Sequence, residues 1–379
     1  MFKFAPYLLK TLWRHRTRTL LTVSGSAVAL FVFCFVLTVR QGLQRLTQQD
    51  DSVLIVFQAN KFCPATSHLP QDYDQVISRM PGVRDVVPIQ VFTNNCRASL
   101  DVVVFYGAPA EKVRRVRDFE LIDGSWGEFE SHQDAAIVGQ ALASRRGIQV
   151  GERFSVGDVT VAVAGLFTSQ NRAEEDYVYC HLDFLQRTRG LDLVGTVTQH
   201  EVWLEDSANP EQAAAAIDEK LKSGQIETDT RTKGAFQASS LADLIHLIDL
   251  SRYLGWACLF LMAVLLATTT IMTVEDRIGE HAVLQTLGFS TRHVFRLVMS
   301  ETVLLSVVGG CVGIALAVLA LSQSALSVGA EAVTIAFEPS WDMVLTAALT
   351  SLVIGLIAGI APAARAAKAD IVTALRFSG

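Results

Sequence analysis

The stretch TLLTVSGSAVALFVFCFVLTV, residues 19–39, has 21 consecutive residues without a formal charge. Three further blocks share this character, 253–274, 302–330 and 343–364, with 22, 29 and 22 residues. A bilayer core of roughly 30 Å takes about 20 helical residues to cross, and a helix satisfies its own backbone polar groups there. The four blocks therefore predict four membrane-spanning helices. The third block is longer than a span needs, so we expect a turn or short helix outside the bilayer at its far end.

The composition supports a membrane protein. Half of the 379 residues are hydrophobic, 18% are charged and the mean hydropathy is +0.34, which excludes a disordered chain or a small disulfide scaffold. No basic stretch with interleaved aromatic residues suggests a nucleic-acid partner, so the expected surroundings are the lipid bilayer.

The distribution of charge predicts the orientation. Residues 40–252 carry 21 Lys and Arg against 30 Asp and Glu, whereas the two ends of the chain and the 275–296 loop together carry 11 against 4. Because loops rich in Lys and Arg stay on the cytoplasmic side, both termini and the 275–296 loop are predicted to be cytoplasmic, and residues 40–252 extracytoplasmic.

The predicted layout follows from these blocks. It comprises a cytoplasmic segment 1–18, span 19–39, an extracytoplasmic domain with stalk helices 40–252, span 253–274, a cytoplasmic loop 275–296, span 297–324, a short extracytoplasmic connection 325–342, span 343–364 and a cytoplasmic tail 365–379. A cleavable signal peptide is the alternative for the first block. Against it, the apolar core is long and the A-x-A-like triplet Ala27-Val28-Ala29 lies in its middle.

Residues 40–252 are enough for a domain with its own core. Alternating apolar residues and turn signals predict strands at 53–57, 86–92, 102–106, 154–156, 160–167, 201–204 and 225–228, and helices at 71–80 and 210–221. The fold class is therefore α+β in two lobes, inserted between the first and second spans. Amphipathic stretches next to both spans predict a stalk of two helices, or alternatively a helix lying on the membrane surface.

Three cysteines fall in this domain and three within spans. Cys63 and Cys96 lie in polar loops next to predicted strands, so we predict a disulfide between them, with three reduced thiols as the alternative. Cys180 would then remain unpaired.

The chain contains none of the motifs of the common hydrolases. It has no G-x-x-x-x-G-K-[ST], H-E-x-x-H, paired C-x-x-C or G-x-S-x-G, so we expect no enzyme activity, no bound cofactor and no metal. The acidic run Glu174-Glu175-Asp176 is interpreted as a solvated loop rather than a pair of catalytic acids.

The spans lack ionisable residues except at edges such as Glu301, which disfavours a channel or a proton-coupled carrier. Small residues recur at four-residue spacing, which lets helices approach closely and predicts tight packing or dimerisation. The predicted packing residues are Gly309, Gly313, Gly355 and Gly359.

The loop 275–289, EDRIGEHAVLQTLGF, predicts a short amphipathic helix that Gly288 ends. Such a helix, tied at both ends to spans, suits docking in a groove of a partner protein. The alternative is a turn at the membrane surface without a partner.

This loop, the following ETVLLSVVGG at 301–310, and the C-terminal PAARAAKADIVTALR at 362–376 resemble the MacB/FtsX/LolC family of ABC transporter permeases. Within 40–252, the segments 81–88 and 137–165 are similar to the family's two-lobed periplasmic domain. Ile371 stands where the family usually has Pro. The chain looks like the split, DevC-like members, whose ATPase is a separate subunit.

The resemblance implies a multi-pass protein of the bacterial inner membrane that works by mechanotransmission. Two ATPase subunits, which bind ATP and Mg, would act on a homodimer of this chain, with a periplasmic membrane-fusion adaptor as a further partner. The residues implied in ATPase coupling are Glu275, Arg277, Ile278, Glu280, Val283, Leu284, Leu287 and Gly288.

Four functions remain open at this point. The first expectation is export or extraction of a substrate at the outer face. A LolC-like release of lipoproteins would need two unlike permeases and a hook-like loop, and an FtsX-like regulator of a cell-wall hydrolase usually has a smaller outer domain. A membrane-anchored sensor without any ATPase is the fourth.

Overall fold

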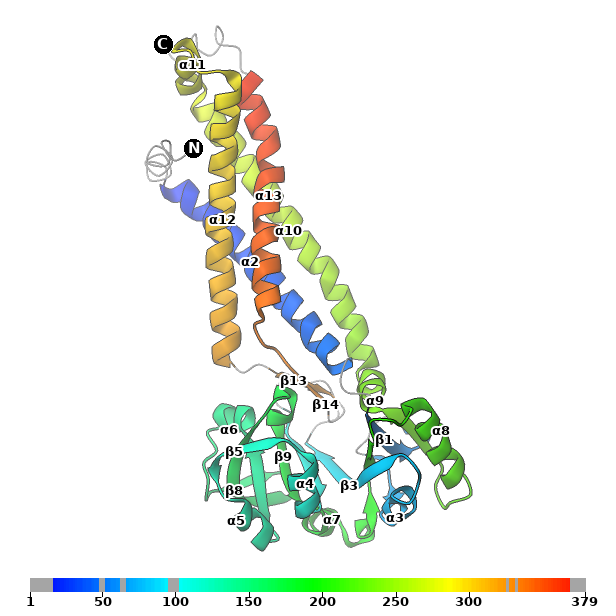
Figure 1. The fold of residues 1–379 in the computed structure, drawn as a ribbon. Helices are drawn as coiled ribbons and strands as arrows, with labels where there is room; N and C mark the ends of the chain where they lie inside the picture. Colours follow the sequence, from blue (N-terminus) through cyan, green and yellow to red (C-terminus); the bar gives the residue numbers. More distant parts are fainter. Residues whose placement is uncertain are drawn as a thin grey trace. The chain divides into compact units, whose positions relative to one another are not determined.

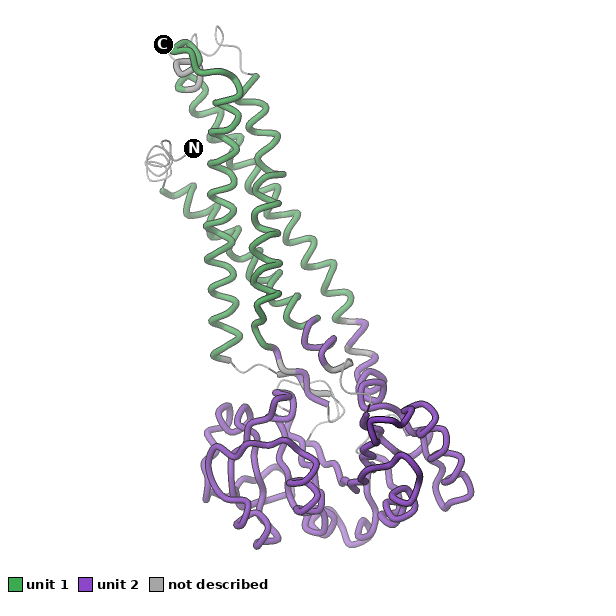
Figure 2. Tube along the Cα trace, in the orientation of Figure 1, with its two compact units in different colours: residues 1–40, 247–323, 338–379 green, residues 41–246, 324–337 purple. Residues whose placement is uncertain are grey.

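The computed structural model describes residues 16–47, 52–61, 66–94, 102–324, 327–330 and 333–368. The chain divides into two compact units, coloured separately in Figure 2. Unit 1 consists of Met1–Arg40, Leu247–Gln323 and Glu338–Gly379, and unit 2 of Gln41–His246 and Ser324–Phe337. Each unit is described by itself below.

Unit 1 is helical. Its helices are α2 (Arg16–Thr47), α10 (Ala242–Asp276), α11 (Ile278–Thr286), α12 (Thr291–Ser324) and α13 (Trp341–Lys368) (Figure 1). The end of α2, the start of α10 and the last residue of α12 belong to unit 2. All but α11 are long and apolar enough to cross a membrane, with mean hydropathy of 2.2 to 2.6. Large apolar side chains such as Trp256 and Leu345 are exposed on them, as lipid-facing residues would be. The prediction of four membrane helices is confirmed.

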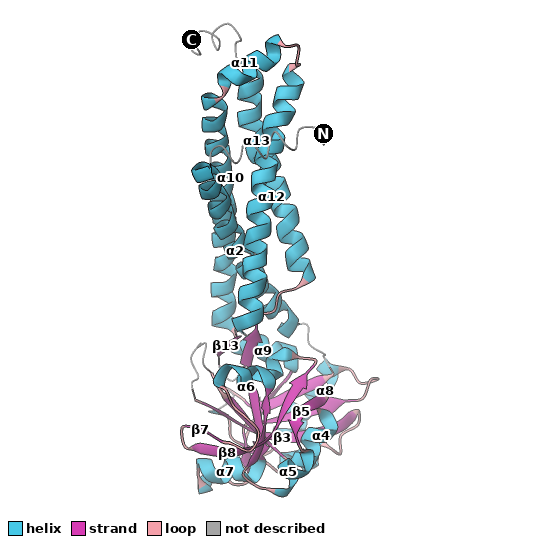
Figure 3. Cartoon of the chain, turned by 90° about the vertical axis from the view of Figure 1, so that its left-hand side faces the viewer, coloured by secondary structure: helices cyan, strands magenta, loops and turns pink. Residues whose placement is uncertain are grey.

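Unit 2 contains one ten-stranded sheet, seen as magenta arrows in Figure 3. The strands run in the order β12-β1-β11-β3-β4-β9-β6-β8-β5, with β7 paired to β8. Their bounds are β1 (Val53–Gln58), β3 (Val83–Thr93), β4 (Val104–Ala108), β5 (Phe119–Gly124), β6 (Ala135–Gly139), β7 (Arg153–Val156), β8 (Val159–Ser169), β9 (Tyr177–His181), β11 (Gln199–Leu204) and β12 (Thr228–Thr232). The pairs β4–β9 and β6–β8 are parallel, and the others are antiparallel. The short strands β2 (Leu69–Pro70) and β10 (Thr196–Val197) pair with each other.

The long strand β3 belongs to both halves of this sheet. Its residues 83–89 pair with β11, and its residues 90–93 pair with β4. We call β12, β1, β11 and the start of β3 the first half, and the rest of the sheet the second half. The helices that pack on the sheet are α3 (Tyr73–Ile77), α4 (Ala110–Val116), α5 (Trp126–Ser131), α6 (Gln140–Arg146), α7 (Leu182–Arg189) and α8 (Pro210–Leu221).

Apolar clusters are buried in both halves, and the cluster around Phe167 also includes Val87 and Ile89 from the start of β3. In the first half, Leu54, Ile77 and Ile217 belong to one buried cluster. In the second half, Val104, Phe129 and Phe167 belong to one cluster, and Phe105, Leu142 and Leu185 to another. The α+β fold predicted from the sequence is confirmed.

Neighbouring residues alone account for the turn between β7 and β8 and for the start of α8. The hairpin between β7 and β8 turns at Gly157 and Asp158, where Gly157 has a φ of 58° that favours glycine. The Asn209 side chain accepts a hydrogen bond from Gln212 N (3.1 Å) and starts α8 with Pro210 in its first turn.

Other expectations were wrong. The strand expected at 225–228 lies at Thr228–Thr232, because β12 pairs with β1 and Asp218 of α8 accepts hydrogen bonds from both Thr228 and Thr230. The helix expected at 71–80 is only Tyr73–Ile77. The bounds of β12 and α3 depend on contacts with distant residues, which the local hydrophobic pattern does not show.

The end of the block 302–330 is neither the turn nor the short helix that we expected. Helix α12 continues to Ser324, and a hairpin of β13 (Ser327–Ala330) and β14 (Val333–Ala336) follows as part of unit 2. Val333, Thr334 and Ile335 are buried there. The last residues of the apolar block, Ser327–Ala330, are thus a strand of unit 2 and not part of the span.

The interpretation of Glu174-Glu175-Asp176 as a solvated loop was also wrong. These residues form the end of a 3-10 helix, η3 (Arg172–Asp176), and all three are buried. Their cationic partners come from distant parts of the chain, so the acidic run by itself looks like solvent-facing sequence.

Candidate functional site: the segment between α10 and α12

The segment that joins α10 to α12 makes two sharp changes of direction. Helix α10 ends at Asp276, and α11 begins two residues later at Ile278. Gly288, with a φ of 93°, follows α11, and Ser290 accepts a hydrogen bond from His293 N (2.8 Å) at the start of α12. The segment therefore presents one short helix between two long ones.

A buried arginine fixes the start of this segment. Arg277, 6% exposed, places its Nε 3.0 Å from a carboxylate oxygen of Glu280 and a terminal nitrogen 3.5 Å from the carboxylate of Glu301. Glu301 lies on α12 and is also buried. Since a buried guanidinium is stable only when paired, these contacts hold the first turn of α11 against α12.

A second ion pair joins the beginning of α2 to the end of α10. A terminal nitrogen of Arg18 lies 2.8 Å from the carboxylate of Asp276, and the other donates to the Thr273 hydroxyl at 3.1 Å. The Asp276 side chain is half exposed and that of Arg18 is partly exposed, so solvent screens the pair, which positions helix ends more than it stabilises them.

The far end of the segment is open and apolar. Leu287 is 72% exposed and Phe289 is 38% exposed. Glu275 and Glu280, at the other end of the segment, are exposed as well. Exposed apolar side chains with charged residues in the same segment, outside the apolar part of the long helices, are typical of a surface that binds another protein.

A groove of about 460 Å³ lies at the root of the same segment. It is lined by the ends of α10 and α13 and the start of α11. Ile271, Val274 and Ile278 supply an apolar wall, while Arg365 and Lys368 of α13 supply positive charge. No local pattern predicts this groove, because α13 is distant from α10 and α11 in the chain.

The predicted coupling residues thus fall into different environments. Arg277 is buried, Ile278 is partly buried, and Glu275, Glu280, Leu287 and Gly288 are exposed. The side chains of Val283 and Leu284 lie outside the described residues. Glu301 completes the Arg277 cluster. The three-residue spacing of Arg277 and Glu280 was a local signal for that pair alone, and nothing local indicated Glu301.

Glycines and serines set the distances between the long helices. A Cβ at Gly309 would lie 2.6 Å from Ser26 of α2, and one at Gly313 would lie 2.4 Å from the Ala27 carbonyl oxygen. Gly355 and Gly359 of α13 approach α12 in the same way, and the Ser306 and Ser351 hydroxyls each donate to the other's carbonyl oxygen at 2.7 and 2.8 Å. These four glycines face helices of the same chain.

The disulfide prediction is outside the described residues, because neither Cys63 nor Cys96 is among them. Cys180 is a buried free thiol on β9, and burial raises its pKa. Among the residues that the structure describes, no group of three His, Cys, Asp or Glu side chains could hold a metal ion.

Two family models match the chain. Residues 19–220 match the MacB-like periplasmic core domain, and residues 253–371 match the FtsX-like permease C-terminal region. The first match alone spans more than half of the chain.

Curated relatives agree with these matches. The ABC transporter permease MJ1507 of Methanocaldococcus jannaschii is 22% identical over 98% of this chain and 96% of its own length. The pyoverdine export ATP-binding/permease protein PvdT of Pseudomonas syringae pv. tomato is 24% identical, and the macrolide export ATP-binding/permease protein MacB of Escherichia coli is 23% identical, each over 97% of this chain. The chain spans 58% and 59% of the length of these two relatives.

Two solved structures are weakly similar. The periplasmic region of MacB from Actinobacillus actinomycetemcomitans is 13% identical, with a TM-score of 0.37 over 50% of this chain and 92% of that one. The extracellular domain of the transporter YknZ from Gram-positive bacteria is 15% identical, with a TM-score of 0.35 over 47% and 98%. From the two family models and the four apolar helices, the chain belongs to the ABC transporter permeases that combine a MacB-like periplasmic core domain with an FtsX-like C-terminal region.

Proposed function

We propose that this chain is the membrane-spanning subunit of an ABC transporter, and that separate ATPase subunits bind the segment between α10 and α12. Two copies of the chain would assemble with two ATPases, which hold ATP and Mg. The excess of Lys and Arg at the chain ends and in the 275–296 loop supports a cytoplasmic position for this segment and an outer position for the large domain in a bacterial inner membrane.

One observation carries the proposal. Helix α11 is braced at its root by the buried Arg277 and Glu301 and the half-exposed Glu280, while Leu287 and Phe289 remain exposed at its far end. A rigid root with an exposed apolar end transmits a push or pull from a bound partner to α10 and α12 rather than absorbing it in a soft loop.

The output we propose is a mechanical change in the α+β domain that drives export or extraction. The chain passes between the two units four times, so movement of the long helices acts on the domain directly. The helices carry few ionisable residues away from their ends, which favours force transmission over a polar conduit. Two relatives are named for export, and by analogy a membrane-fusion adaptor would act with the large domain.

The test compares two exposed leucines. Leu287→Arg places a charge at the proposed ATPase contact, and Leu191→Arg, at an 80% exposed position of unit 2, is the matched control. The tagged full-length chain is purified from its native membrane in mild detergent, and ATP-binding subunits are labelled with azido-ATP. We expect Leu287→Arg to reduce the recovered ATPase at least tenfold, and Leu191→Arg to leave it unchanged.

If both variants recovered equal amounts of ATPase, the segment between α10 and α12 would not be the ATPase-binding site. If no azido-ATP-labelled subunit accompanies the unaltered chain, the alternative of a sensor without an ATPase is favoured instead. Recovery of an unlike second permease would favour a LolC-like pair, and recovery of a cell-wall hydrolase an FtsX-like regulator.

A further inference from the structure

The buried acidic run of η3 needs an explanation. Glu174, Glu175 and Asp176 are consecutive in sequence and are 8%, 5% and 1% exposed. Removing a carboxylate from water is costly unless it is paired and hydrogen-bonded. Three such groups in a row are therefore retained only where the fold supplies partners for each.

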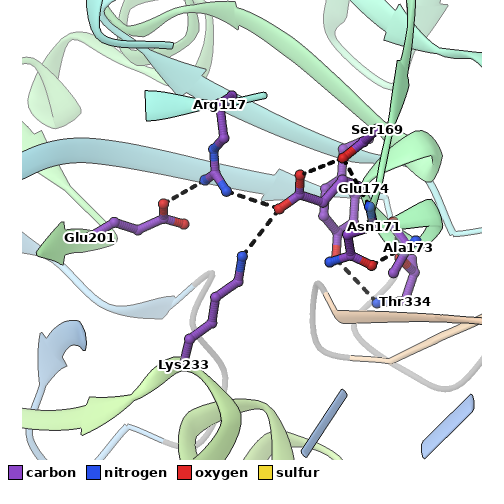
Figure 4. A network of polar contacts seen from close by, with 9 residues as sticks. Arg117, Ser169, Asn171, Ala173, Glu174, Glu201, Lys233 and Thr334 are labelled. Atoms are coloured by element: carbon purple, nitrogen blue, oxygen red, sulfur yellow. Dashed lines mark hydrogen bonds and ion pairs between the residues drawn. The ribbon is translucent and has the colours of Figure 1, made fainter. Parts of the chain in front are cut away.

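Glu174 lies at the centre of a charge network (Figure 4). One of its carboxylate oxygens accepts from Arg117 at 3.0 Å and from Lys233 at 3.1 Å, and the other accepts from the Ser169 hydroxyl at 3.2 Å. Arg117 also donates to Glu201 at 2.5 Å. Two cations and two carboxylates thus balance in a site where all four side chains are at most 17% exposed.

The electrostatics favour the ionised state of this network. Burial alone would raise the pKa of Glu174, but the charges of Lys233 and Arg117 and the hydrogen bonds from Lys233 and Ser169 outweigh it, so the pKa is lowered. For Arg117, burial acts to lower the pKa, but the nearby acidic groups raise it well above its ordinary value.

The four residues come from different parts of unit 2. Arg117 directly follows α4, and Glu174 is in η3; both belong to the second half of the sheet. Glu201 is on β11, in the first half. Lys233 is the first residue of α9 (Lys233–Ser240), the helix that precedes α10 in the chain. The network therefore joins the two halves to each other and to α9.

Helix η3 is also the place where the α12–α13 connection contacts the domain. The Thr334 hydroxyl of β14 donates to the Ala173 carbonyl oxygen at 2.8 Å. In the same helix, the Asp176 carboxylate accepts a hydrogen bond from Arg145 at 2.9 Å. The backbone of Glu175 lies so close to Gly139 that a Cβ there would be 2.2 Å from the Glu175 carbonyl oxygen. Helix η3 is thus held closely in the second half, while Glu174 extends to the first half and to α9.

We propose that the Glu174–Lys233 ion pair is a releasable latch, which holds α9 to η3 in the second half of the sheet and opens when α9 is displaced. Lys233 is the member of the network whose side chain can separate from its partner. Among the described contacts its charge pairs with Glu174 alone, whereas Arg117 pairs with both carboxylates. Lys233 is also the least buried of the four side chains, and an ammonium on a flexible stem has no bidentate geometry to lose.

This inference deepens the proposed function, since the force that displaces α9 would come from the ATPase through α10. The latch itself is a property of the chain alone. Release leaves Glu174 with Arg117 and Ser169, so the second half keeps its contacts while the connection to α9 is lost. The two halves then remain joined through β3 and the Arg117–Glu201 pair.

The test is hydrogen exchange followed by mass spectrometry on the full-length chain in detergent, without an ATPase. Lys233→Met removes the charge and keeps most of the side-chain volume. We expect exchange in η3 and at the start of α9 to become at least tenfold faster, while β6 and β8 exchange as before. Lys233→Arg restores a cation and should exchange within threefold of the unaltered chain.

The matched control is Lys222→Met, which removes an exposed lysine paired with Glu219. Unchanged exchange in η3 and α9 with Lys233→Met would overturn the latch, and so would an equal acceleration with Lys222→Met or throughout unit 2. Because no ATPase is present, this result is independent of the ATPase recovery with Leu287→Arg, and the two proposals can fail separately.

Discussion

The two units each contain an arginine buried between two carboxylates, and the two clusters differ in their access to water. Arg277 in unit 1 pairs with Glu280 and Glu301, and the Glu280 side chain is 46% exposed. Arg117 in unit 2 pairs with Glu174 and Glu201, whose side chains are 11% and 3% exposed. The same triad is therefore half open in one unit and closed in the other.

This difference separates two mechanical roles. In the half-solvated triad, water replaces a lost Glu280 contact at little cost, while the buried Arg277–Glu301 pair still holds the root of α11. A closed triad has no such replacement, so it keeps its geometry until a partner is removed. We expect substitutions in unit 2 to cost more than the equivalent ones in unit 1.

The largest effect is expected for Arg117→Met. This change leaves Glu174 with Lys233 but leaves Glu201 buried without its cation, at a cost of about 3–5 kcal/mol in the stability of unit 2. Hydrogen exchange of β11 and β9 in the full-length chain gives the local free energy of opening. A cost below about 1 kcal/mol would contradict a closed triad.

The second largest effect is expected from acid, which should lower the stability of unit 2. His200 on β11 is buried, its Nε2 lies 3.1 Å from the Pro70 carbonyl oxygen, and burial lowers its pKa to about 4 from 6.5. The unfolded chain therefore binds a proton between these values, so the stability of unit 2 falls by about 3 kcal/mol as pH drops from 6.5 to 4. Below pH 4.5, protonation of Glu174 adds to the loss, because its folded pKa is also lowered.

His200→Gln should remove the part of this dependence above pH 4.5. The measurement is hydrogen exchange of β11 and β1 from pH 7.5 to 4.5. Dividing each rate by the intrinsic exchange rate at that pH gives the free energy of local opening. The matched control is His132→Gln, an exposed histidine at the end of α5, which should keep the full slope. If the opening free energy of the His200→Gln variant still fell with pH as before, another group would cause the acid sensitivity.

A smaller effect is expected for Arg277→Met. Glu280 regains water, and only Glu301 remains buried without its cation, so the cost is about 1–3 kcal/mol. The loss should be confined to α11 and the first turns of α12, as measured by hydrogen exchange. A cost equal to that of Arg117→Met would remove the contrast between the two triads.

The smallest effects are expected where ion pairs in both units are exposed. Arg18→Gln breaks the pair with Asp276, and Arg153→Gln breaks the pair with Asp134. Each should cost less than about 1 kcal/mol, because solvent screens both partners. The midpoint of thermal unfolding in detergent is a sufficient measurement. Similar small losses in the two units would show that burial, rather than the unit, sets the cost of a lost charge.

Much of the architecture could be predicted from local sequence. Four uncharged blocks define the four long helices, because a helix satisfies its own backbone hydrogen bonds in lipid. The Gly157-Asp158 turn and the Asn209 cap depend on neighbouring residues alone. The 275–289 segment, with Gly288 after its helix, is likewise local. The sequence by itself thus determined the class of protein and the place of its short exposed helix.

Only the tertiary structure decided how the polar groups are used. Glu174 is separated by 57 residues from Arg117 and by 59 from Lys233, so no local pattern distinguishes its acidic run from a solvated loop. The same holds for Glu301 beneath Arg277, for the groove lined by Arg365, and for the strands of the α12–α13 connection. A charge is stable in the interior only if its partner is brought to it, and which residues meet is decided by the pairing of distant strands and helices.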